Sequence, residues 1–222
     1  MFKGTPELIA ERREEIINAC EKLYQTMSFR EITLKEIGKE TSFSRPTIYN
    51  YFHTKEEIFL ALFEREYVLW NQELEGIFAE HEELTAQELA DLIARSLTHR
   101  TQLLKLLSMN NYDMEANSRP ELLTSFKRAY GKSMKNIGRL LEKFCPGMSA
   151  GEIQRIIYVF FPFMFGIHPY AFVTDKQRVA MKEADVSYAY LSVYELTYAC
   201  LTRLLARSQA DISKQQHDKE SM

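Results

Sequence analysis

The chain has 222 residues, a formal net charge of −3 and an apolar fraction of 45%. This length and apolar content exclude an intrinsically disordered chain, because a buried core can form. Three cysteines far apart in sequence and an N-terminus without an apolar segment exclude a disulfide framework, a zinc ribbon and a secretory signal, so we expect a cytoplasmic protein.

Helix-start signals recur along the chain, whereas patterns that alternate with period two are scarce. Ser or Thr followed three residues later by Glu or Gln is the capping box that opens many helices. Six such pairs precede apolar patterns of helical period: Thr33/Glu36, Thr54/Glu57, Thr85/Glu88, Ser118/Glu121, Ser149/Glu152 and Thr174/Gln177. Thr5 before Pro6 is a seventh start. The sequence therefore predicts an all-α fold.

The segments between these starts give the predicted helices in chain order. They cover about 6–27, 34–40, 45–51, 55–80, 86–97, 99–109, 119–144, 150–168, 175–184 and 186–208. The helix over 55–80 would be ~39 Å long, enough to leave one domain and enter another. The tail, 209–222, contains few apolar residues, and we expect it to be disordered.

Residues 156–173 form an 18-residue run without a formal charge, at the lower limit of a membrane span. The run contains Pro162 and Pro169. A helix interrupted by proline and buried in a core explains this run at least as well, and no second candidate span exists. We therefore expect a protein that does not cross a membrane.

Residues 33–52 combine two short predicted helices that meet at a turn over Thr41–Phe43. This is a helix-turn-helix pattern, in which the second helix can enter the major groove of DNA. Arg and Asn side chains can each form paired hydrogen bonds to a base, and hydroxyl and ammonium groups suit phosphates. The candidates are the groove-facing Arg45, Thr47, Asn50 and Tyr51, and the phosphate-facing Thr47, Tyr49 and Lys55.

The segment from Ile16 to about Phe63 resembles the TetR family of bacterial transcriptional regulators, in its AcrR-like form. The most specific part is the run Ile48-Tyr49-x-Tyr51-Phe52-x-x-Lys55-Glu56. The resemblance implies a helix-turn-helix DNA-binding domain over 1–54 and a helical ligand-binding and dimerisation domain over 55–208. It implies DNA contacts from Thr33, Ser44, Arg45, Thr47, Tyr49, Asn50, Tyr51 and Lys55, with Tyr51 left open between groove-facing and packed.

The turn departs from the family pattern. The family usually has a small residue, Gly and Val where this chain has Thr41-Ser42-Phe43. It commonly has Ala where Gly38 stands, and Gly near the end of the first helix, where Met27-Ser28 stands. Because glycine tolerates a positive φ and serine does not, we expect Ser42 to be strained.

The charge of the first sixty residues limits how they can bind DNA. They contain nine basic and ten acidic residues, a net charge of −1. A bulk basic field is excluded, so binding has to come from a few oriented donors and helix N-termini. We expect a shallow salt dependence per subunit, since that slope counts the neutralised phosphates.

The C-terminal half suggests a homodimer and an effector site. The predicted helix 186–208 is apolar over a wide arc, with small residues, and the resemblance implies a four-helix dimer interface with helix 150–168. A dimer suits a palindromic double-stranded DNA operator. The resemblance also implies a pocket for a small apolar or aromatic effector. Its candidate residues are Trp70, Met109, Tyr112, Phe126, Tyr130, Phe163, Met164 and His168.

No histidine or cysteine pair has metal spacing, and no nucleophile, acid–base or nucleotide motif occurs in the sequence. We therefore expect neither an enzyme nor a cofactor or metal site. The expected function is that of a repressor released by a small molecule. Two alternatives stay open: an activator on the same scaffold, and a helical binding protein or enzyme that has lost DNA binding.

Overall fold

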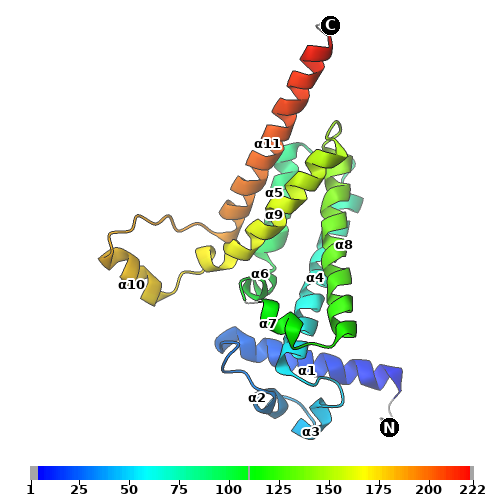
Figure 1. Cartoon of the computed structure of the whole chain (residues 1–222), viewed down its shortest axis with the longest axis vertical. Helices are drawn as coiled ribbons and strands as arrows, with labels where there is room; N and C mark the ends of the chain where they lie inside the picture. Colours follow the sequence, from blue (N-terminus) through cyan, green and yellow to red (C-terminus); the bar gives the residue numbers. More distant parts are fainter. Residues whose placement is uncertain (1–4, 110, 221–222) are drawn as a thin grey trace. The chain divides into compact units, whose positions relative to one another are not determined.

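The computed structural model describes residues 5–109 and 111–220, without the side chains of Arg45, Asn111 and 207–220. Within this part of the chain every regular element is a helix (Figure 1). The helices are α1 (Pro6–Thr26), α2 (Leu34–Lys39), α3 (Arg45–Ile48), α4 (Lys55–Glu80), α5 (Ala86–Thr98), α6 (Thr101–Leu107), α7 (Asn111–Ala116), α8 (Pro120–Phe144), α9 (Ala150–Ala171), α10 (Asp175–Glu183) and α11 (Val193–Glu220). The predicted all-α fold is confirmed.

The chain forms two compact units, and each unit is made of two separate segments of the sequence. Unit 1 contains Met1–Glu66 and Asn110–Tyr130, and unit 2 contains Tyr67–Met109 and Gly131–Met222. The helices α4 and α8 each contribute turns to both units. Unit 1 therefore includes the insertion, by which we mean residues 110–130: α7 and the first turns of α8.

Unit 1 is built around a core to which α1, α2, α3 and the start of α4 each contribute. The fully buried side chains include Ile16, Cys20, Ile37, Ile48, Phe52 and Phe59. Tyr24 and Phe29 contact the Phe59 ring edge-on, with centroids 5.1 and 4.8 Å away. Edge-to-face pairs add stabilisation beyond that from the burial of these large rings. They hold the first turns of α4 against the end of α1 and the segment that follows it.

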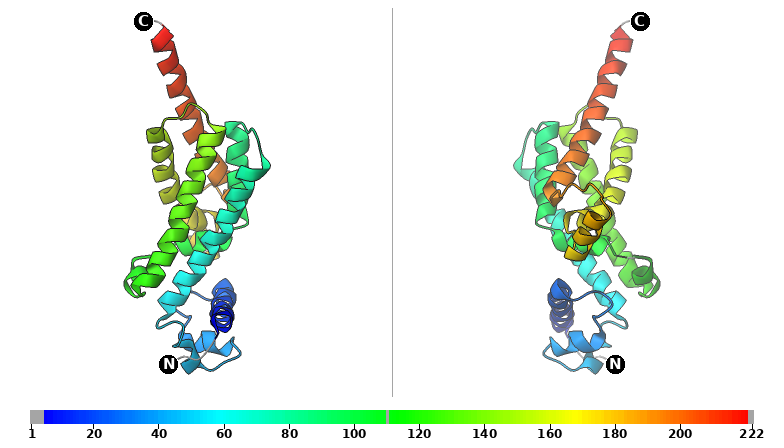
Figure 2. Two further views of the ribbon diagram at one scale, coloured as in Figure 1. Left: turned by 90° about the vertical axis from the view of Figure 1, so that its right-hand side faces the viewer. Right: turned by 90° about the vertical axis from the view of Figure 1, so that its left-hand side faces the viewer.

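Unit 2 is a helical bundle in which α11 packs against α5 and α9, and α9 also packs against α6. Its largest buried side chain is Trp70, whose indole N–H donates to Ser96 Oγ at 2.9 Å. The later turns of α4 and α8 lie side by side (Figure 2), joined by Asn136 Nδ2 donating to Asn71 Oδ1 at 3.0 Å. Buried polar side chains such as these amides need a hydrogen-bond partner, and each supplies one to the other.

Most predicted helix starts are confirmed by their capping bonds. Thr85, Ser149 and Thr174 each form a complete capping box with the residue three positions on. Thr33 and Thr54 accept from the backbone N–H of Glu36 and Glu57 at 3.4 and 3.1 Å. These side chains satisfy backbone donors that a helix start would otherwise leave unpaired.

The predicted pair Ser118/Glu121 is wrong. Ser118 Oγ instead donates to Met114 O at 2.6 Å, and α8 begins at Pro120 after Arg119. Proline favours the first helical position, so α8 begins at Pro120 and the preceding residue, Arg119, takes the cap position instead of Ser118. The prediction of one helix over 99–109 is also too long, because α6 covers Thr101–Leu107, and α7 was missed.

The predicted start of the last helix at residue 186 is wrong, because α11 begins at Val193. Ser192 and Glu195 form the capping bonds there, with the Ser192 N–H donating to Glu195 Oε2 at 2.8 Å. Tyr190 therefore lies before the helix and is 54% exposed. The predicted end at 208 is also wrong, because α11 continues to Glu220. The disorder expected over 209–222 stays a prediction.

The helix α9 contains the apolar run, and by length and composition alone it could cross a membrane. Only 39% of its most apolar 18-residue window is buried. Ile156, Phe160 and Met164 face the core of unit 2, whereas Tyr158 and Phe165 are exposed. Beside this bundle, α10 stands apart in Figure 1 and buries none of its residues.

Candidate nucleic-acid interface

The two short helices of the predicted motif, α2 and α3, are positioned by their caps and by buried apolar residues. Ile37 of α2 and Ile48 of α3 are fully buried and anchor both helices to the unit 1 core. Ser44 occupies the N-cap of α3, and its O accepts from the Thr47 N–H at 2.8 Å. Ser44 forms no side-chain cap bond, since its Oγ lies 3.2 Å from Thr47 Oγ1.

The turn between α2 and α3 is held by a carboxylate from α1. Both the N–H and the Oγ of Ser42 hydrogen-bond to Glu15, the latter at 3.1 Å. Thr41 Oγ1 lies 3.2 Å from Gly38 O and 3.1 Å from Phe43 O. Within residues 5–109 and 111–220, Asp185 is the one non-glycine residue with positive φ. The expected strain at Ser42 is therefore wrong: a turn without glycine forms in an ordinary backbone conformation, supported by Glu15.

The helix α3 is shorter than predicted, and its end presents several candidate side chains to solvent. It covers Arg45–Ile48 rather than 45–51. Asn50 is exposed, Tyr49 is 42% exposed and Thr47 is half-buried. The Arg45 side chain lies outside the described part, so its groove contact stays a prediction.

Tyr51 is packed rather than groove-facing. It is 4% exposed, and its hydroxyl accepts from Arg12 Nη1 at 3.4 Å. Its ring centroid lies 6.4 Å from that of Phe43. The alternative left open by the sequence is thus decided in favour of packing, because the turn after Ile48 brings this ring inward.

Lys55 begins α4, where the sequence suggests a phosphate contact. Its ammonium donates to Phe29 O at 2.7 Å and to Ile32 O at 3.2 Å, and lies 4.1 Å from the centroid of the Phe29 ring. Lys55 thereby satisfies carbonyls of the segment that follows α1. Its phosphate contact stays a prediction, and Thr33 is exposed at the start of α2.

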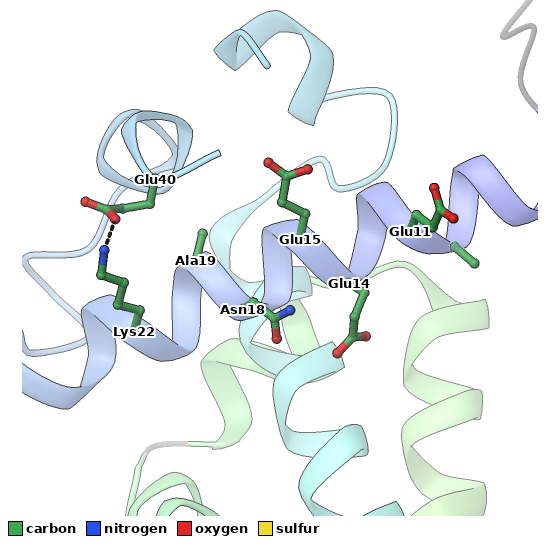
Figure 3. Close-up of a pocket in the computed structure, with 8 residues that line it drawn as sticks. Glu11, Glu14, Glu15, Asn18, Ala19, Lys22 and Glu40 are labelled. Carbon is green, nitrogen blue, oxygen red and sulfur yellow. Dashed lines mark hydrogen bonds and ion pairs between the residues drawn. The ribbon is translucent and has the colours of Figure 1, made fainter. Parts of the chain in front are cut away.

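Four of the eight residues that line an open groove along α1 are glutamates (Figure 3). Glu11, Glu14 and Glu15 come from α1, with the Glu14 and Glu15 side chains pointing to different sides of the helix (Figure 3). Glu40 pairs with Lys22 of α1, with the ammonium 2.6 Å from the carboxylate. Negative charge repels phosphate, so this groove is unsuited to a DNA backbone. The DNA contacts expected at α3 stay a prediction.

The structure contains an ion pair between α4 and the insertion that the sequence does not predict. Glu57 is 1% exposed, and its carboxylate accepts from Arg119 Nε at 2.7 Å and Arg119 Nη2 at 3.0 Å. It also accepts from the His53 N–H at 2.7 Å and the Arg119 N–H at 3.2 Å. No motif indicates this pair, because its members are far apart in sequence and the spacing of Glu57 from Thr54 indicates only a capping role.

The hydrogen bonds determine the ionisation of this pair. Burial alone would raise the pKa of Glu57, but the hydrogen bonds from Arg119 and from the His53 N–H outweigh burial and hold the pKa below its ordinary value. The Glu57 carboxylate in turn raises the pKa of Arg119. Both groups are charged at neutral pH, and four donors satisfy the buried carboxylate.

The predicted effector residues are divided between the two units. Tyr112, Phe126 and Tyr130 belong to unit 1, whereas Trp70, Met109, Phe163, Met164 and His168 belong to unit 2. Tyr112 is 87% exposed, while Trp70 and Met164 are fully buried. Phe126 packs against Phe63, with the two centroids 4.8 Å apart. The pocket therefore stays a prediction, with the unit 2 residues as its core candidates.

Two family profiles match the chain along most of its length. Residues 16–62 match the profile described as bacterial regulatory proteins, tetR family. Residues 64–205 match the profile described as tetracyclin repressor-like, C-terminal domain.

Individual relatives agree with these profiles. The HTH-type transcriptional regulator HbdR of Aromatoleum sp. (strain CIB) is 40% identical over 58 residues, which are 26% of this chain and about a quarter (25%) of HbdR. The uncharacterised HTH-type transcriptional regulator YfiR of Bacillus subtilis (strain 168) is 26% identical over 156 residues, 69% of this chain and 74% of YfiR. The fold resembles that of Thermus thermophilus FadR, a TetR-family transcriptional repressor solved with lauroyl-CoA, at 20% identity and a TM-score of 0.58, covering 87% of this chain and 93% of FadR.

Proposed function

The chain belongs to the TetR family of bacterial transcriptional regulators, and from this membership we propose that it is a cytoplasmic repressor released from its operator by a small-molecule effector. The finer assignment to AcrR-like members rests on the motif residues and is part of this proposal. The repressor would bind DNA in the effector-free state, and the effector would act through its different affinity for the two states.

The observation that carries the DNA-binding role is the division of side chains at the end of α3. Ile48 and Phe52 are fully buried, whereas Tyr49 and Asn50 between them are exposed. The two buried side chains therefore hold the backbone at the end of α3 in place, and the Tyr49 hydroxyl and the Asn50 amide lie at the surface. An amide can bond bidentately to adenine, and a hydroxyl suits phosphate.

The exposed face of α9 supports a homodimer. Tyr158, Val159 and Phe165 are 62, 50 and 41% exposed on a helix whose opposite face is buried. Exposed large apolar side chains gathered on one helix mark an interaction surface. We place a second copy there, with the small residues Ala199 and Ala206 of α11 permitting close helix approach. A two-fold dimer would present two copies of α3 to a palindromic operator.

In this proposal, the effector binds within unit 2. The buried Trp70 and Met164 and the half-buried Phe163 are apolar or aromatic side chains of unit 2, and side chains of this kind suit an apolar ligand. Lys105 is half-buried on α6, and burial lowers the pKa of its ammonium. An anionic group on a ligand would favour the charged form of this ammonium. A medium-chain acyl-CoA combines an apolar tail with anionic groups and is the first effector to test.

Recovery of bound DNA tests the DNA-binding role. Fragments would be recovered with the wild-type protein from its own host, sequenced and titrated with wild type and with the double variant Tyr49→Phe/Asn50→Ala. Both substituted side chains are at the surface, so the melting temperature should not change. We expect the variant to bind at least about tenfold more weakly, since a bidentate pair between an amide and a base is worth about 1–3 kcal/mol. Equal affinity of the two proteins would reject the assignment.

A further inference from the structure

The insertion of unit 1 is fastened to the first turns of α4. Thr54 Oγ1 donates to Asn117 O at 3.0 Å, and Ser125 Oγ donates to Glu64 Oε1 at 2.6 Å. Between these contacts lies the ion pair of Glu57 with Arg119. These polar contacts recur along α4, so this part of α4 and the insertion form one fastened element.

Arg119 is bonded to more than its ion-pair partner. The same Nη2 that contacts Glu57 also donates to Tyr51 O at 2.9 Å. Glu57 in turn accepts from the His53 N–H at 2.7 Å. Residues 51–53 form the corner between α3 and α4. Arg119 therefore holds, directly and through Glu57, the backbone that immediately follows the DNA-facing helix.

The chain continues from the insertion into unit 2 at both ends, after Met109 and at Gly131. Arg119 directly precedes α8, and α8 extends through the insertion into unit 2. A change in unit 2 that displaces α8 would be carried along this helix to Arg119. A helix is a stiff element, and it can bias a two-state element at its far end.

We propose that Arg119 is a positioning residue that couples α8 to the corner at 51–53, and so carries the effector state of unit 2 to α3. This inference rests on the proposed function. It assigns the coupling to a particular guanidinium and to the Tyr51 carbonyl that it binds. The reverse coupling must exist as well, because linkage between two binding events is reciprocal. DNA binding at α3 should therefore change the behaviour of α8 in unit 2.

A double substitution separates coupling from stability. Removing Arg119 alone would leave a buried carboxylate without its partner, which is strongly destabilising. Replacing both members with apolar residues of similar size is often neutral for stability, so Glu57→Leu/Arg119→Met should fold. This double variant also lacks the hydrogen bonds to Tyr51 O and the His53 N–H. Arg128→Met, an exposed arginine on the same helix, is the matched control.

The experiment is hydrogen–deuterium exchange of the full chain, free and saturated with a DNA fragment recovered with the wild-type protein. We expect DNA to slow exchange at least about twofold in residues 131–144 of wild type and of Arg128→Met. In Glu57→Leu/Arg119→Met, whose melting temperature should stay within a few degrees of that of wild type, saturation with DNA should leave exchange in 131–144 unchanged.

The outcomes separate the two claims. Specific DNA binding with the same exchange response in the double variant would overturn the role of Arg119 and leave the proposed function intact. Specific binding by wild type without any response in 131–144 would do the same. If wild type bound no recovered fragment better than random DNA, the proposed function would fail, and the coupling role with it.

Discussion

Glu15 shows at the scale of a residue how a turn can form without glycine. The family pattern has glycine in the turn between the two motif helices, and this chain has Ser42. One α1 carboxylate binds both the N–H and the hydroxyl of Ser42. Hydrogen bonds to a charged group are among the stronger ones in proteins. The position of α3 therefore depends on a residue of α1 that lies outside the motif itself.

Substituting Glu15→Gln should lower the free energy of unfolding by about 1–2 kcal/mol, because an amide cannot replace both charged hydrogen bonds to Ser42. DNA affinity should fall as well, since the turn orients α3. Thermal melting and DNA titration measure the two effects. Glu11→Gln, on the exposed surface of the same helix, is the control and should change neither. An unchanged melting temperature for Glu15→Gln would contradict this role.

His168 makes the stability of the protein depend on pH. Burial, and secondly the Lys105 ammonium, lower the pKa of this imidazole from 6.5 to about 4. Between these two values the unfolded chain binds a proton that the folded chain does not, so stability should fall as the pH falls. His168→Gln should flatten this decline relative to wild type in melts from pH 7 to 4, whereas the exposed His99→Gln should not. Parallel pH profiles for wild type and His168→Gln would exclude this source of acid sensitivity.

At the scale of elements, caps decide where helices begin. The boundaries of α4 agree with the prediction at both ends, and Thr54 caps its first turn. The apolar pattern predicts too early a start for α11 because it extends back through Tyr190, whereas the capping pair Ser192/Glu195 marks the observed start. A helix start is therefore indicated more reliably by a capping pair than by apolar periodicity alone.

The start of α11 can be tested by a pair of serine substitutions. Ser192→Ala should cost about 1 kcal/mol, because it removes the acceptor for the Glu195 N–H. For a chain of this size the melting temperature should fall by about 2–4 °C. Ser187→Ala lies before the helix and should change the melting temperature little. If Ser187→Ala were the more destabilising of the two, the helix would begin near residue 186 in solution.

The sequence was sufficient for the fold class, the positions of most helices and the location of the motif, since local caps and periodicity determine them. It was insufficient for Tyr51, whose inward position depends on the shortness of α3. It also did not indicate that Arg119 binds Glu57, since the two residues are 62 positions apart. Such contacts follow from the packing of distant segments, and a single sequence does not contain a local signal for them.

At the scale of the whole molecule, the proposed dimer face on α9 is the feature with the largest consequence. Tyr158→Glu introduces a charge in the middle of the exposed face of α9, where a partner would have to desolvate it. Sedimentation velocity should show a monomer at concentrations where wild type is a dimer, with dimer affinity at least about tenfold weaker. Val179→Glu, an exposed apolar position on α10, is the matched control. A dimeric Tyr158→Glu protein would place the interface elsewhere.

The net charge of −3 is also a property of the whole molecule, and it provides little nonspecific electrostatic attraction to DNA. The acidic groove along α1 adds local repulsion at its own surface. In the proposed dimer, DNA binding then has to rely on a few oriented contacts per subunit, present twice. Such a protein should be selective for its operator and should bind random DNA poorly.

The salt dependence of DNA affinity tests this account most directly. Wild type would be titrated with a recovered operator fragment and with a scrambled fragment, from about 50 to 200 mM salt. With two to four neutralised phosphates per subunit, the slope of log affinity against log salt should be about −4 to −7 for the dimer, and the operator should be preferred throughout. A slope of about −10 or steeper, with equal affinity for the scrambled fragment, would contradict the account.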